Sequence, residues 1–208
     1  MTTVSHLEVL VEEPSMEAFL RELLPRLLGN QSTFEVYPFQ CKNELLERLL
    51  QRLKAYRGWL PADWRIVIVV NADNDDCKRL KERLEQNVAA AGLRSRRVAG
   101  NTEPWQVVTR IAIEELEAWY FGDWHAVKQC YPRVPASIPN KAAYRDPDAI
   151  AGGTWETFER LLQSAGYFVG GLGKIEAARA IGQKLDWQQN HSYSFGIFRD
   201  AVLGAIKP

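Results

Sequence analysis

Cysteine and histidine are scarce in this chain, and the spacings that make either residue a metal ligand are missing. The three cysteines, Cys41, Cys77 and Cys130, are far apart and have no CxxC spacing. An odd, scattered set argues for reduced thiols in a cytosol and against a disulfide framework or a zinc site. His125 and His191 lack the HExxH spacing of a zinc enzyme. We therefore expect a cytoplasmic protein without a cysteine or histidine metal site.

An excess of either charge is also absent. Lysine plus arginine and aspartate plus glutamate number 26 each, so the formal charge is zero at pH 7. This balance excludes a general basic coat for nucleic acid, and any polyanion must bind locally. No apolar run approaches the length of a membrane span, and no basic segment followed by an apolar one opens the chain. We expect no membrane association.

Strand and helix patterns alternate over roughly the first 120 residues. Strand patterns cover residues 6–11, 33–39, 64–70, 93–98 and 107–113. Helical spacing of apolar residues follows the first three, with the second and third helices at 43–56 and 75–91. Five consecutive β-branched residues, 66–70, are typical of a strand buried on both faces. The alternation predicts an α/β fold with a mainly parallel sheet flanked by helices.

The second part of the chain has no β-branched run of strand length. Prolines punctuate residues 132–147, and helical patterns follow at 155–164, 175–184 and 194–206. We therefore divide the chain into an α/β core, residues 1–122, and a helical C-terminal extension packed on it, residues 123–208.

Acidic side chains follow three of the predicted strands. They are Glu12 and Glu13 after the first strand, Asp73, Asp75 and Asp76 after the third, and Glu114, Glu115 and Glu117 after the last. Because the carboxyl ends of parallel strands share one edge, these acids can converge on one cleft, where Mg²⁺ or Mn²⁺ would relieve their repulsion. The alternative is local: each acid caps the next helix or gains about 0.3–1 kcal/mol from its macrodipole.

Two basic features of the sequence are candidates for contact with an anion. Arg94, Arg96 and Arg97 form the densest basic patch, which either tracks a nucleic-acid backbone or protects an exposed edge strand. Lys174 follows the glycine-rich residues 170–173 and either contacts a phosphate or is a solvated lysine at a helix start. The glycines lack GxxxxGK[ST] spacing and a preceding strand, so we do not expect ATP to bind there.

A glutamate after the first strand and an aspartate-rich segment after the third resemble the Toprim superfamily, the metal-binding α/β domain of topoisomerases, primases and overcoming-lysogenization-type nucleases. More closely, the ordered blocks VEEPS (11–15), DNDDC (73–77), IEELEAW (113–119) and GGLGK (170–174) resemble a small stand-alone bacterial Toprim-like family described as a domain of unknown function. The similarity spans nearly the whole chain.

This resemblance implies phosphodiester cleavage or related phosphoryl transfer on nucleic acid, DNA or RNA, often beside an ATPase partner protein in bacterial anti-phage defence. By position, Glu12 matches the Toprim glutamate and Asp73 the second aspartate of its Asp-x-Asp pair. Asn71 stands where the first aspartate is expected. An amide oxygen can coordinate Mg²⁺, but it carries no charge and cannot act as a base.

We therefore expect a divalent-metal-dependent nuclease. Its catalytic residues would be Glu12, Asp73 and Lys174, its metal ligands Glu12, Asp73, Asp75 and Glu117, and its further candidate residues Glu13, Asn71, Asp76 and Glu114. The carboxyl groups of Glu12 and Asp73 should lie on the same sheet edge, and Glu117 should face Asp73 unless it points to solvent. The alternative is a non-catalytic Toprim-fold partner or sensor subunit of an ATPase complex, with Asn71 as the mark of lost turnover.

Overall fold

The computed structural model describes residues 3–100 and 103–206. The first half of the chain alternates strands and helices: β1 (His6–Val11), α1 (Pro14–Leu28), β2 (Thr33–Pro38), α2 (Lys42–Arg57), β3 (Trp64–Asn71), α3 (Cys77–Ala90), α4 (Arg96–Ala99) and β4 (Val107–Ala112). All strand pairs are parallel, and the order across the four-stranded sheet is β2-β1-β3-β4. The predicted α/β fold is confirmed.

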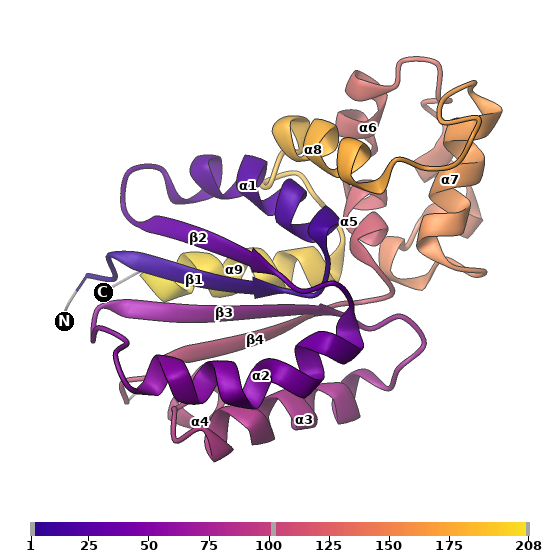
Figure 1. The fold of residues 1–208 in the computed structure, drawn as a ribbon. Coiled ribbons are helices and arrows are strands. Elements are labelled where there is room, and N and C mark those ends of the chain that lie inside the picture. Colours follow the sequence, from indigo (N-terminus) through magenta and orange to yellow (C-terminus); the bar gives the residue numbers. More distant parts are fainter. Residues whose placement is uncertain (1–2, 101–102, 207–208) are drawn as a thin grey trace.

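Helices cover both faces of the sheet (Figure 1). Val67 and Val69 of β3 pack in one core with residues of α1 and α9 (Tyr193–Ile206). Ile66 and Ile68 pack in a second core with residues of α2 and α3. The period of two along a strand sends alternate side chains to opposite faces, so the continuous apolar run of β3 follows from its burial on both sides.

The second half of the chain is helical. It contains α5 (Leu116–Gly122), α6 (Trp124–Cys130), α7 (Thr154–Ser164), α8 (Lys174–Lys184) and α9, with short 3₁₀ turns at Ile138–Asn140, Ala142–Tyr144 and Pro147–Ala149. Helices α5 to α8 form a lobe beside the carboxyl ends of the strands, whereas α9 returns along the sheet (Figure 1). Trp119 and Trp124 are buried. Among the described helices, none has both the length and the apolar character to cross a bilayer.

The strand predicted at residues 93–98 is wrong. Within that segment, Ser95 makes only an isolated parallel bridge to Val107, and Arg96 begins the one-turn helix α4. The Ser95 hydroxyl caps this turn by accepting a hydrogen bond from the backbone N–H of Val98 at 3.4 Å. Val98 is 75% exposed, and of the two apolar residues of the segment only Leu93 packs against a core. A local serine cap therefore displaces strand pairing here.

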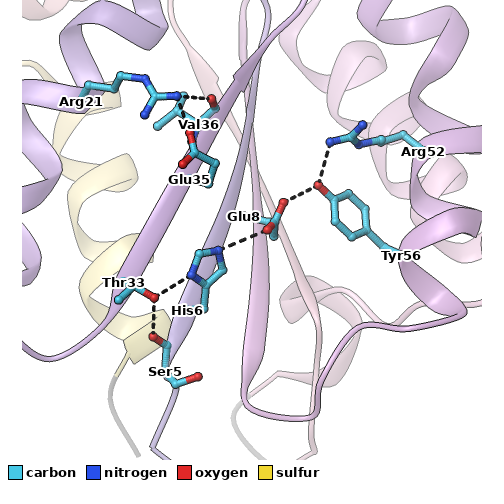
Figure 2. Close-up of polar contacts among 9 residues, drawn as sticks. All are labelled: Ser5, His6, Glu8, Arg21, Thr33, Glu35, Val36, Arg52 and Tyr56. Carbon is cyan, nitrogen blue, oxygen red and sulfur yellow. Dashed lines mark hydrogen bonds and ion pairs between the residues drawn. The ribbon is translucent and has the colours of Figure 1, made fainter.

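A polar network around the buried side chains of Glu8 and Tyr56 lies towards the amino ends of the strands, away from the predicted acidic edge (Figure 2). Glu8 accepts a hydrogen bond from the Tyr56 hydroxyl at 2.5 Å and contacts the His6 Nε2 atom at 3.2 Å. The other ring nitrogen of His6 lies 2.7 Å from the Thr33 hydroxyl, which donates to the backbone carbonyl of Ser5. Because that hydroxyl proton is committed to a carbonyl, the network is structural rather than nucleophilic.

Candidate active site at the carboxyl edge of the sheet

Glu12 is fixed at the carboxyl edge of the sheet by the neighbouring strand. Its Oε2 atom accepts a hydrogen bond from the backbone N–H of Asn71 at 2.8 Å. Burial raises the pKa of the Glu12 carboxyl to about 7; the Asn71 hydrogen bond opposes this shift, and the charge of Asp73 adds to it. Because β1 and β3 are adjacent and parallel, Glu12 and Asp73 lie at the same edge, as predicted.

A lysine neutralises the acids that follow β3. The ammonium of Lys42, the first residue of α2, lies 2.7 Å from Asp73 Oδ2 and 2.9 Å from Asp75 Oδ2. It also donates to the carbonyl of Ala72 at 3.0 Å. Burial works to lower the pKa of Lys42, but the hydrogen bonds to Asp73 and Asp75 outweigh it and the pKa is raised. The structure thus joins these two acids through a fixed cation.

The turns that follow β3 and β4 are tied together in strained backbone. The N–H of Asp73 donates to the carbonyl of Glu114 at 2.7 Å. Both residues adopt left-handed conformations, with φ of +47° and +59°, which cost of order 1–3 kcal/mol for residues other than glycine and gather at functional sites. Burial raises the pKa of Glu114, and the charge of Asp73 adds to the shift.

Glu117 lies deeper, in the first turn of α5. Its side chain is buried, and burial raises its pKa to about 8, opposed by the charge of Lys174 and reinforced by Glu13. The alternative, in which Glu117 points to solvent, is therefore wrong. The charges that act on Glu117 are those of Lys174, Glu13 and Glu115. Glu13 in turn accepts a hydrogen bond from the Asn71 side chain at 3.3 Å, which links the acid after β1 to the end of β3.

Glu115 and Lys174 connect the site to the helical lobe. Glu115 Oε2 accepts hydrogen bonds from the Thr154 hydroxyl and the Trp155 N–H, both at 3.0 Å, and so caps the start of α7. The Lys174 ammonium lies 4.8 Å from the centre of the Trp155 ring. Lys174 is thus held by a cation–π contact at the start of α8, within electrostatic reach of Glu115 and Glu117.

Asp76, one of the acids selected from the sequence, has a local role. Asp76 caps α3 by accepting hydrogen bonds from the N–H groups of Lys78 and Arg79, at 2.8 and 3.0 Å. This is the capping alternative rather than metal binding. Ser15 lies inside α1, whose N-cap residue is Glu13. The Ser15 hydroxyl is buried without a hydrogen-bond partner in the described part of the chain.

The predicted basic patch is divided. Arg94 pairs with Glu103 at the surface. Arg96 and Arg97 instead line a hollow beside Arg110 of β4. The structure therefore keeps two of the three arginines together and adds a cation from the edge strand.

The donor atoms at this edge fit a hydrated divalent ion. Within residues 3–100 and 103–206, no three aspartate, glutamate, histidine or cysteine side chains are grouped closely enough to hold a metal by themselves. Mg²⁺ is usually bound through one or two carboxylates, several waters and substrate phosphate, so such a group is not required. Asn71 Oδ1 and Glu117 Oε2 are buried oxygens without a hydrogen-bond partner in the same residues, and both are hard ligands.

Sequence reasoning missed Lys42 and Tyr120. Lys42 is the first residue of α2, and the helix macrodipole disfavours a cation at a helix N-terminus. This unfavourable charge could have indicated that Lys42 pairs with an anion elsewhere in the fold. Tyr120 is buried near Glu117 and Glu13, and its hydroxyl has no hydrogen-bond partner among the described residues. Tyr120 falls within the apolar pattern of α5, so the sequence gives no sign of this unpartnered hydroxyl.

One of the comparisons with known proteins finds a match, and it covers most of the chain. A family model described as a domain of unknown function (DUF4276) matches residues 11–203. Neither the curated proteins nor the solved structures contain a match. The matched span includes every residue of the carboxyl-edge site.

Proposed function

We propose that this chain, which belongs to the DUF4276 family, is a Toprim-like, divalent-metal-dependent nuclease that cleaves phosphodiester bonds in nucleic acid. One observation carries the proposal: acids that follow three parallel strands meet at one edge, tied by the Glu12–Asn71 and Asp73–Glu114 hydrogen bonds. In open α/β sheets, ligands bind beyond the carboxyl ends of the strands. The strained backbone at Asp73 and Glu114 supports the same location.

Glu12 is the proposed proton-transfer group. Its pKa of about 7 leaves a mixture of protonated and ionised carboxyl near neutral pH. A group with such a pKa can accept a proton from attacking water or donate one to the leaving oxygen. The Asn71 N–H holds one carboxyl oxygen at 2.8 Å and thereby orients the other.

The remaining residues supply charge and ligands. Asn71 and Asp73 would hold Mg²⁺ or Mn²⁺, with Asp75 and Glu117 contributing from either side, while Glu12 keeps its role in proton transfer. When bound, such an ion polarises a phosphoryl oxygen and stabilises the leaving oxygen. Lys174, held over Trp155, would neutralise charge that develops on the phosphate.

A second function, a non-catalytic partner or sensor subunit of an ATPase complex, is favoured by the position of Lys42. Its ammonium already neutralises Asp73 and Asp75, the acids on which metal binding depends. Together with Asn71 in place of an aspartate, this pairing would suit a site that keeps its shape without turnover.

A cleavage assay separates the two functions. We expect the native protein to cut single-stranded DNA, duplex DNA or structured RNA with Mn²⁺ or Mg²⁺ and not with EDTA. Asp73→Ala should reduce the rate by roughly 100-fold or more because it removes a metal ligand. The matched control is Glu47→Gln, an exposed carboxylate on α2, which should leave the rate unchanged. Activity that survives Asp73→Ala, or no activity on any substrate with either metal, would refute the enzymatic proposal.

A further inference from the structure

A basic groove runs along the free edge of the sheet. Two adjoining hollows, with volumes of about 550 and 350 Å³, lie between α3 and α9 at the edge strand β4. Lys81, Arg97, Arg110 and Ile197 line both hollows, and we call the joined surface the β4 groove.

The groove gathers positive charge in a chain with no net charge. Its lining contains five cations, Lys78, Lys81, Arg96, Arg97 and Arg110, against the acids Glu82 and Asp200. Burial lowers the pKa of Arg110, and the neighbouring Arg96 lowers it further. Arg97 is exposed and forms no ion pair among the residues that the structure describes. Such a surface complements an anionic chain.

Apolar and aromatic side chains lie between these cations. Ile111, Ile113 and Ile197 line the larger hollow, and Tyr193 stands at its margin with 75% of its surface exposed. A cationic groove with an exposed aromatic side chain is the arrangement that binds single-stranded nucleic acid, since phosphates follow the cations and bases stack on the ring.

One end of the groove opens at the candidate active site. Cys77, which lines the larger hollow, directly follows Asp76, and Ile113 directly precedes Glu114. Tyr193, the first residue of α9, lines this same hollow, whereas Asp200 and Ala201 line the other. A strand lying in the groove would therefore lead towards the acidic edge.

We propose that the β4 groove binds one strand of nucleic acid, with phosphates at Lys78, Arg97 and Arg110 and a base stacked on Tyr193. Binding itself does not require the metal site. The cleavage of the bound strand rests on the proposed nuclease function.

Fluorescence anisotropy with a short labelled single-stranded oligonucleotide in EDTA tests the groove without cleavage. We expect native binding to weaken with salt, and Arg97→Gln or Lys78→Gln to weaken it further and to lower the slope of log K against log salt by about 0.7 each. Arg83→Gln is the matched control, since Arg83 is exposed on α3 outside the groove lining. Tyr193→Ala should weaken binding roughly five-fold or more, and Tyr193→Phe should retain it.

Several results would overturn the groove. The first is that the native protein does not bind the oligonucleotide, and the second is that Arg83→Gln and Arg97→Gln lose equal affinity. The others are that a duplex binds more tightly than the single strand, or that polyglutamate of equal charge displaces the oligonucleotide. Binding that depends on Arg97, without metal-dependent cleavage, would refute the nuclease proposal and support the groove proposal. Cleavage that is unchanged by substitution of Arg97, Lys78 and Tyr193 would refute the groove proposal and support the nuclease proposal.

Discussion

At the scale of single residues, two buried carboxyl groups determine the electrostatics of the carboxyl-edge site. Burial raises the pKa of Glu12 to about 7 and that of Glu117 to about 8. A buried acid that holds its proton above its ordinary pKa opposes folding at higher pH, since the unfolded chain ionises more readily. A divalent ion would reverse this penalty by favouring the charged form.

The first prediction concerns Glu117 and pH. Its folded-state pKa is raised from 4.5 to about 8, so between these values unfolding releases a proton and stability falls as pH rises. Glu117→Gln mimics the protonated acid and should reduce this slope, stabilising the protein above pH 8 by roughly 2–4 kcal/mol. Urea unfolding in EDTA across this pH range measures the effect. Glu47→Gln should keep the native slope, and a native-like slope in Glu117→Gln would contradict the prediction.

The second prediction concerns the buried network at the opposite end of the sheet. Tyr56→Phe removes the 2.5 Å hydrogen bond to Glu8 and leaves a buried carboxylate short of a donor (Figure 2). Bonds to charged groups contribute about 1.5–3 kcal/mol, so we expect destabilisation of that order in chemical denaturation. Tyr193→Phe, at an exposed tyrosine, should change stability little. Equal stability of the two variants would show that the hydrogen bond between Tyr56 and Glu8 does not stabilise the fold.

Residue positions at this site could be predicted in part. Glu12 and Asp73 follow adjacent parallel strands, so backbone topology alone brings them to one edge. Lys42 could not be placed in the same way, because its contact with Asp73 depends on how its long side chain extends from α2 to the turn after β3. The orientation of Glu117 also depends on the packing of α5, which period and propensity do not specify.

At the scale of elements, strand and helix patterns predicted the sheet because burial imposes a clear period. The strand pattern at residues 64–70 corresponds to β3, and its apolar run reflects two covered faces. The strand prediction for residues 93–98 failed because a serine cap and exposed arginines favoured a helical turn. The packing of α8 against α1 was beyond sequence reasoning, since it depends on close backbone approach at Gly182.

The third prediction tests that approach with a pair of helical glycines. A methyl group added at Gly182 would lie 2.8 Å from the carbonyl oxygen of Phe19, whereas one added at Gly196 would meet nothing within 4 Å. Gly182→Ala should therefore destabilise the protein by roughly 1–3 kcal/mol through forced separation of α8 and α1. Gly196→Ala should stabilise it by up to about 1 kcal/mol through helix propensity. Thermal unfolding of both variants gives the signs, and like signs would contradict the packing argument.

At the scale of the whole molecule, zero net charge conceals a separation of opposite charges. Acids gather beyond the carboxyl ends of the strands, and cations line the β4 groove that opens beside them. Composition could exclude a uniformly basic surface, but it could not reveal this local arrangement. The separation suits a molecule that guides an anionic strand to a cation-dependent site.

The most direct test of the central claim is calorimetric titration with Mn²⁺. We expect the native protein to bind Mn²⁺, Asn71→Asp to bind it more tightly through an added anionic ligand, and Asp73→Ala to lose binding. The two substitutions should act in opposite directions, with Glu47→Gln matching the native protein. No Mn²⁺ binding in either the native protein or Asn71→Asp, together with lower stability of Asn71→Asp from added repulsion, would contradict the account and favour a non-catalytic subunit.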